Sequence, residues 1–215
     1  MKKRHVFAAI AALAVAGSAS AATIVGVDEN NNLVTFDSAN PGTFTSSIGI
    51  TGTSATFLAM DVRDSNATLY GLGDDFRLYK INRTTGVATA VGANPLAITG
   101  TNFGFDFNTA IDALRVVSNN GNNYVVNPNT GVLTGTFTPV AFGAGDPNAG
   151  MTPIVTGNGY LHGTPTQYAI STGQDVLVTQ ANNAGTLATV GTVLSTLVVG
   201  GMVFAVMHAV GLSVS

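Results

Sequence analysis

Two aspartates that stand 45 residues apart, Asp61 and Asp106, have the types and positions most suited to chemistry in this chain. Each follows an apolar run within a short alternating segment, so both are expected on equivalent strands of a repeated unit. Carboxylates placed in this way could hold a divalent cation or act as acid and base in hydrolysis. The simpler interpretation is structural, with each aspartate accepting hydrogen bonds from a neighbouring repeat or capping the next turn.

Asp28 and Asp146 complete the set of candidate cation ligands. Asp28 opens a run of five acidic and amide residues with oxygens at alternate positions, as in a calcium loop. Leu33 and Ala39, however, stand where such a loop carries its glycine and its closing acid. Asx turns in hairpins explain Asp28 and Asp146 more simply. Calcium is therefore the only cofactor that the sequence suggests, with these four aspartates as its candidate ligands.

Groups for nucleophilic catalysis are scarce. The chain has no cysteine, no Gly-x-Ser-x-Gly elbow and, beyond residue 21, only two histidines, His162 and His208. His162 is expected on a strand beside Tyr160, as a packed or exposed residue rather than a base. Arg115 is expected to pair with Asp112 or with the nearby Asp106. The sequence therefore assigns no catalytic residue.

The elements that position these residues repeat at an offset of 45 residues, with Gly86, for example, recurring as Gly131. Four short alternating segments between turn clusters fill residues 57–91, and four more fill residues 104–138. Four strands in such a period are typical of a propeller blade. The sequence therefore predicts an all-β, propeller-like domain over residues 22–193, with about four blades of four antiparallel strands.

The first and last parts of this domain break the pattern. Thr23–Val27, Leu33–Phe36 and Phe44–Ile48 match strands two to four of a blade, which leaves its first strand missing. The apolar tail over residues 194–215 offers Met202–Met207 as a closing strand. A degenerate terminus is the alternative, and so is a membrane span, because residues 194–214 carry no charge. The absence of flanking basic residues argues against the span.

Residues 1–21 have the form of a secretory signal peptide. A basic start at residues 2–4 precedes an apolar run, and Ala19-Ser20-Ala21 fits a cleavage site. Removal of this segment leaves five basic residues against eleven acids, a net charge of −6. The basic residues form no stripe, so nucleic-acid binding is not expected. The expected location is outside the cytoplasm, as a secreted, periplasmic or cell-surface protein.

Several phrases resemble the domain of unknown function 4394 family of secreted bacterial proteins. The phrases lie in this order between Thr23 and Gly191, at residues 33–42, 104–108, 112–117, 127–131, 145–150, 175–180 and 185–191. The resemblance implies a secreted propeller-like domain without an assigned activity. Proteins similar to this one usually continue into another blade, whereas this chain turns into its apolar tail. The resemblance therefore leaves open whether the ring closes or is truncated at this end.

The expected function is that of a non-catalytic binding or structural module. Thr138 to Pro153, the longest segment between expected strands, is the favoured recognition loop, since binding groups concentrate on the loops of rigid scaffolds. Its Thr- and Asn-rich surroundings suit a protein or a glycan, and a membrane would be a partner only through the apolar tail. The alternative is a lactonase- or glycosidase-like hydrolase that uses channel-facing carboxylates and a bound cation. That alternative requires Asp61, Asp106 and either Asp28 or Asp146 to converge.

Overall fold

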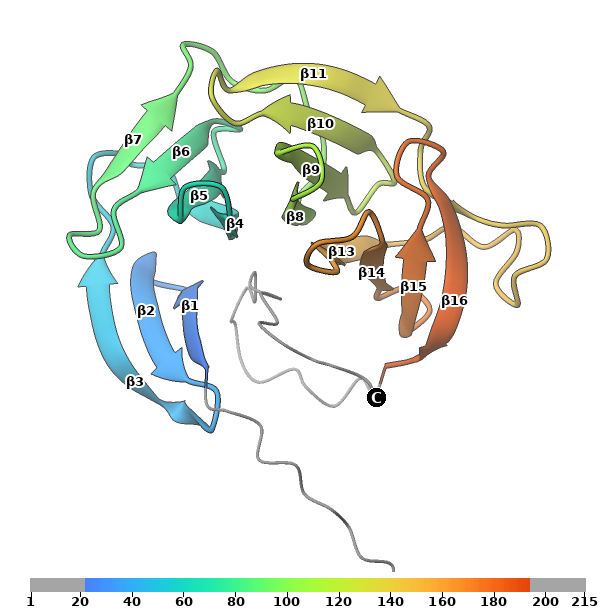
Figure 1. The fold of residues 1–215 in the computed structure, drawn as a ribbon, viewed down its shortest axis with the longest axis horizontal. Coiled ribbons are helices and arrows are strands. Elements are labelled where there is room, and N and C mark those ends of the chain that lie inside the picture. Colours follow the sequence, from blue (N-terminus) through green and yellow to red (C-terminus); the bar gives the residue numbers. More distant parts are fainter. Residues whose placement is uncertain (1–21, 194–215) are drawn as a thin grey trace, which may run out of the picture.

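The computed structural model describes residues 22–193, which form four small sheets arranged around a common axis (Figure 1). The first sheet contains β1 (Thr23–Val27), β2 (Asn32–Asp37) and β3 (Asn40–Gly49). The second contains β4 (Phe57–Arg63), β5 (Thr68–Gly73), β6 (Leu78–Ile81) and β7 (Ala88–Val91). The third contains β8 (Phe103–Asn108), β9 (Ala113–Ser118), β10 (Asn123–Asn127) and β11 (Val132–Phe137). The fourth contains β13 (Val155–Tyr160), β14 (Gln167–Ser171), β15 (Val176–Gln180) and β16 (Thr186–Thr192), with β12 (Ala141–Phe142) at its outer edge.

This arrangement is a four-bladed β-propeller, as the repeat predicted. Apart from β12, the strands of each blade run antiparallel in sequence order, and β4, β8 and β13 lie nearest the axis (Figure 1). The first sheet has three strands among the described residues, because β1 pairs only with β2. Met202–Met207, the expected closing strand, lies outside the described residues, as does the alternative membrane span over residues 194–214. Within residues 22–193, no helix of the length and apolarity needed to cross a membrane is found.

The hydrophobic core is divided into three layers, each between two neighbouring blades. Leu33 of the first blade packs in one layer with Phe57 and Ile81 of the second. The next layer joins Tyr70 and Phe107, whose ring centroids are 5.3 Å apart with the planes at 62°. A third layer joins the third and fourth blades. Since the second and third blades are apolar on both faces, neither can bury its core without its neighbours.

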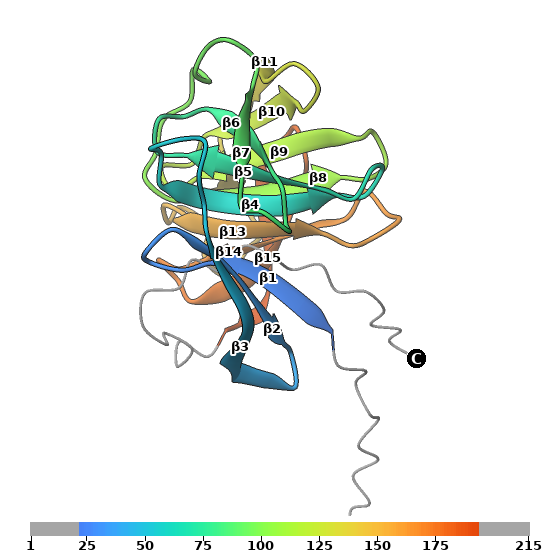
Figure 2. The same ribbon diagram turned by 90° about the vertical axis from the view of Figure 1, so that its left-hand side faces the viewer.

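The fourth blade departs from the expected four strands. The segment between β11 and β13 contains β12, which pairs in parallel with the outermost strand β16 through Ala141↔Thr186 and Phe142↔Leu187. The expected recognition loop is therefore partly fixed as a fifth strand. Phe142 is buried in the third core layer, whereas Met151 farther along the same segment is half exposed. Figure 2 shows the same arrangement of blades from the side.

Glycines at the turn between the third and fourth strands lie close to the preceding blade in the second, third and fourth blades. Gly86, Gly131 and Gly185 occupy the turns between the third and fourth strands and have φ values of 73°, 63° and 69°. A Cβ at Gly86 would lie 2.5 Å from the Gly49 carbonyl oxygen of the preceding blade. The other two turns approach the preceding blade in the same way, at Val91 and at Thr138. Both the left-handed backbone and the lack of space therefore require glycine at these turns.

Candidate functional site

Asp61 and Asp106 lie on the innermost strands β4 and β8, and both are buried. The Asp61 carboxylate accepts hydrogen bonds from the backbone N–H of Val62 at 2.7 Å and of Phe107, in the next blade, at 2.9 Å. Asp106 repeats the arrangement, because it accepts from the backbone N–H of Tyr160 in the fourth blade at 2.7 Å. Both aspartates therefore accept a hydrogen bond from the neighbouring repeat.

The two carboxyl groups also interact with each other through a side-chain hydrogen bond. Burial, together with the negative charge of Asp61, raises the pKa of Asp106 to about 9. A hydrogen bond between two carboxyl groups requires that one of them carry a proton. Asp61 already accepts two backbone N–H groups, which favour negative charge on it. Asp106 is consequently the member of the pair that holds the proton near neutral pH.

Asp28 and Asp146 lie in separate turns away from this pair. The Asp28 carboxylate accepts from the backbone N–H of Asn30 and Asn32, at 3.0 and 2.8 Å, and closes the turn between β1 and β2. Asp146 accepts from the backbone N–H of Asn148 at 2.8 Å and of Thr189 at 2.5 Å, and so fixes its loop to β16. Among residues 22–193, no three histidine or acidic side chains gather as a cation site would require. The structure thus brings Asp61 and Asp106 together and leaves the other two apart.

Two buried arginines join neighbouring blades. Arg63 at the end of β4 donates to Asp112 in the third blade at 2.8 and 2.5 Å, and to Asn129 at 2.7 Å. Its bond with Asp112 holds the pKa of Arg63 above its ordinary value and the pKa of Asp112 below its own. The sequence expectation that Arg115 pairs with Asp112 is therefore wrong, because Arg63 takes that carboxylate.

Arg115 instead reaches the fourth blade. Its guanidinium donates to the side-chain oxygens of Asn123 at 2.8 Å, Asn183 at 2.9 Å and Tyr160 at 3.3 Å. It lies opposite Asp106 in the strand pair β8–β9, but the two form no salt bridge in the described part of the chain. Asn129 and Asn183 occupy equivalent turns of the third and fourth blades. Each arginine therefore binds the corresponding turn of the following blade.

Around the axis, three hairpins enclose a pocket of about 400 Å³, which we call the axial pocket. It lies at the ends of the innermost strands and is lined by Asp64, Ser65, Phe107, Thr109, Ala110, Asp112, His162 and Gly163. His162 Nε2 lies 3.3 Å from the Asp64 carboxylate, which joins the β4–β5 and β13–β14 hairpins. The Ser65 hydroxyl donates to Asp112 at 3.1 Å and joins the second blade to the third. The pocket thus presents carboxylates and hydroxyls over a buried aromatic ring.

The position of His162 differs from the sequence expectation. The strand β13 ends at Tyr160, and the backbone N–H of Thr164 donates to the Leu161 carbonyl at 3.0 Å to form a turn. His162 therefore lies in the hairpin after an innermost strand, and its side chain is largely exposed. No sequence signal indicated its pairing with Asp64, because 98 residues separate the two positions.

Replacement of Asp112 by asparagine tests the Arg63–Asp112 contact. Asparagine suits the positive φ of 50° at this position but removes the charge. Because the pKa of Asp112 is lowered in the folded chain, its contribution exists above its ordinary value near 3.8 and disappears as the pH falls through the lowered value. We expect D112N to lose about 1 kcal/mol of unfolding free energy at pH 7, and almost nothing at pH 2, in denaturant titrations. An equal loss at both pH values would contradict the charge-based account.

The fold and the pocket together define a class, namely a four-bladed β-propeller with a pocket at the mouth of its axis. More particularly, the chain belongs to the family described as domain of unknown function DUF4394, whose model matches residues 32–205. The sequence resemblance to this family is therefore confirmed.

Three solved structures are similar to this chain. Dihydro-heme d1 dehydrogenase NirN in complex with DHE is 11% identical, and the match covers 79% of this chain and 35% of that chain with a TM-score of 0.46. BamB from Moraxella catarrhalis is 12% identical, with 79% of this chain and 44% of that chain covered and a TM-score of 0.38. YCF48 from Cyanidioschyzon merolae is 10% identical, with 81% of this chain and 57% of that chain covered and a TM-score of 0.43. This chain therefore spans between about a third and somewhat over half of their lengths. None of the curated proteins matches the chain.

Proposed function

We propose that this chain is a non-catalytic binding module, exported from the cell, that takes a hydroxyl-rich ligand such as a glycan in the axial pocket. The observation that carries the non-catalytic part of the proposal is the structural role of Asp61 and Asp106. Both carboxyl groups hold the backbone of the following blade, so their burial and pairing serve the joints between blades. The signal-like residues 1–21 support export.

The lining of the axial pocket supports a polar, uncharged ligand. The Asp64 carboxylate suits the hydroxyl donors of a sugar ring, whereas the carboxylate of Asp112 is already bound by Arg63 and Ser65. Ser65 and Thr109 add hydroxyls, and the volume of about 400 Å³ is within the range of small-molecule sites. Because the rim is tied across three blades by side-chain contacts, the pocket is preorganised.

A binding screen tests this proposal. The purified chain is applied to an array of neutral and acidic oligosaccharides, beside the A110W variant and the control variant G145W. Ala110 is exposed in the axial pocket, and Gly145 is exposed on the loop after β12, where a Cβ would meet no neighbouring atom within 4 Å. We expect A110W to weaken the best neutral ligand about tenfold or more, because the indole fills the pocket, and G145W to leave it unchanged. Equal binding by A110W and the parent chain would contradict the location of the site.

The hydrolase alternative is tested on the same preparations. It requires Asp61 and Asp106 as the reacting pair, so lactone and glycoside substrates should be cleaved at a rate that D106N abolishes. We expect no hydrolysis above background by the parent chain. Turnover that depends on Asp106 would establish the enzyme and overturn the proposal.

A further inference from the structure

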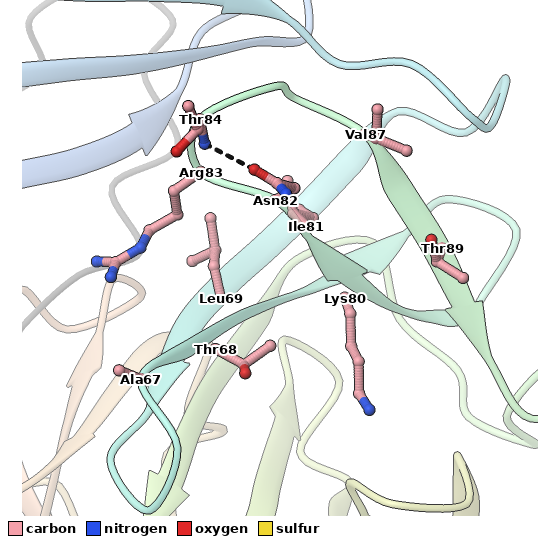
Figure 3. Close-up of a pocket in the computed structure, with 10 residues that line it drawn as sticks. All are labelled: Ala67, Thr68, Leu69, Lys80, Ile81, Asn82, Arg83, Thr84, Val87 and Thr89. Carbon is pink, nitrogen blue, oxygen red and sulfur yellow. Dashed lines mark hydrogen bonds between the residues drawn. The ribbon is translucent and has the colours of Figure 1, made fainter.

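A second and more open pocket, of about 590 Å³, lies on the second blade (Figure 3). Strands β5, β6 and β7 and the turn between the last two line it, so its lining is separate from that of the axial pocket. Its polar side chains include the hydroxyls of Thr68, Thr84 and Thr89 and the charged groups of Lys80 and Arg83. No carboxylate lines it. We call it the basic pocket.

The basic pocket carries positive charge, although the chain as a whole is acidic. Residues 22–193 contain five basic side chains, and Arg63 and Arg115 are buried in the joints between blades. Arg77 donates to the Ala93 carbonyl at 2.8 Å and lies 3.7 Å from Asp75. The remaining two, Lys80 and Arg83, both line the basic pocket, and neither forms a salt bridge within the described residues. The accessible positive charge of residues 22–193 is therefore concentrated here.

The directions of the two cationic side chains limit the ligand. In Figure 3 the side chains of Lys80 and Arg83 diverge, and Thr68 and Leu69 lie between them in that view. Lys80 Nζ also lies 5.9 Å from the centroid of the Tyr70 ring, a cation–π contact with the residue that Lys80 faces in the β5–β6 pair. Two diverging cations are poorly placed to enclose one small anion. They are better placed to meet successive acidic groups along an extended chain.

We propose that the basic pocket binds an acidic polysaccharide that carries carboxylates on its sugar rings, such as a polyuronate. Lys80 and Arg83 pair with successive uronate carboxylates. The threonine hydroxyls, which both donate and accept, bind the ring hydroxyls between those carboxylates. An acidic peptide is the competing occupant, and the hydroxyls of Thr68, Thr84 and Thr89 in the lining favour a hydroxyl-bearing chain over it. This site adds to the axial pocket and does not depend on it.

Titration of the full chain with an oligogalacturonate tests the proposal, with its fully methyl-esterified form as the uncharged probe. We expect saturable binding of the acidic oligomer that weakens when the salt concentration rises, and no comparable binding of the ester. K80Q and R83Q should each weaken binding about threefold, and the double variant about tenfold. R77Q is the matched control, because it removes the same charge from the same blade outside the pocket. It should leave the affinity unchanged.

Four results would overturn the proposal. One is equal binding of the acidic oligomer and its ester, which would mean that charge is not recognised. Another is an equal loss in R77Q and K80Q, which would mean that only the net charge matters. The third is binding of a polyglutamate peptide as tight as that of the uronate oligomer, which would assign the pocket to acidic protein segments. Neutral-glycan binding that A110W abolishes, without any uronate binding, would refute this inference and leave the axial site intact.

Discussion

Replacement of Asp106 by asparagine is expected to make the protein more stable above pH 7. The pKa of Asp106 in the folded chain, about 9, is far above its ordinary value of 3.8. A raised value means that the stabilising effect of the protonated group is complete below pH 4 and is lost as the pH rises towards 9. The folded chain therefore loses stability progressively across this interval. Asparagine is uncharged at every pH and removes that dependence.

The amide also preserves the local hydrogen bonds. Its oxygen can accept from the backbone N–H of Tyr160, and its N–H₂ group can replace the shared proton as a donor to Asp61. No like-charge repulsion then remains between β4 and β8. Groups facing Asp106 include Asp61 and Asp64 of the second blade, Arg115 across the strand pair, and Tyr160. Of these, the two aspartates raise the pKa and the Tyr160 N–H lowers it.

Thermal unfolding between pH 4 and pH 9 measures the effect. We expect the D106N variant to match the parent chain at pH 4 and to exceed it by about 2 kcal/mol or more at pH 8. For a domain of this size, the melting temperature should rise by about 4 to 8 °C. D175N is the control, because Asp175 is exposed in a turn at a φ of 53° that asparagine also adopts, and this variant should follow the parent chain. A D106N variant that is less stable than the parent chain at pH 8 would show that Asp106 acts as an ionised group.

The repeat at 45 residues predicted the fold class and the equivalence of Asp61 and Asp106 because alternation and turn residues are local properties. The expected strands Thr23–Val27 and Val132–Thr138 agree with β1 and β11 to within a residue. The hydrogen-bond donor to each carboxylate could not be predicted from these local properties. It is a backbone N–H of the following blade, which becomes close only when blades pack.

Departures from the 45-residue repeat explain the other differences between the sequence predictions and the structure. Gly159 stands opposite Tyr168 in the fourth blade, where the equivalent positions of the two preceding blades carry Asp61 and Asp106. The line of carboxylates therefore ends after two members among the described residues. A longer connection precedes this blade, and its extra residues form β12 and the loop held by Asp146. Because the offset there is no longer 45, the positions of His162 and Asn183 were not evident from the repeat.

The joint between blades gives the other prediction of large effect, the replacement of Gly131 by alanine. At a φ of 63° an L residue other than glycine costs about 1–2 kcal/mol. The added Cβ would also collide with the Val91 carbonyl of the preceding blade, which is backbone and cannot rotate away. We expect G131A to lose about 3 kcal/mol or more of unfolding free energy, and to melt about 6 °C or more below the parent chain.

Two alanine variants separate the backbone strain from the collision. Gly150 has a similar φ of 82° but open space where a Cβ would lie, so G150A should lose about 1 kcal/mol through strain alone. Gly145 has neither the positive φ nor a neighbour within 4 Å, so G145A should be close to neutral. If G131A and G150A were equally stable, the third blade would be free to move away from the second. A larger loss in G131A would show that the turn glycines, rather than side-chain contacts alone, set how closely the blades approach.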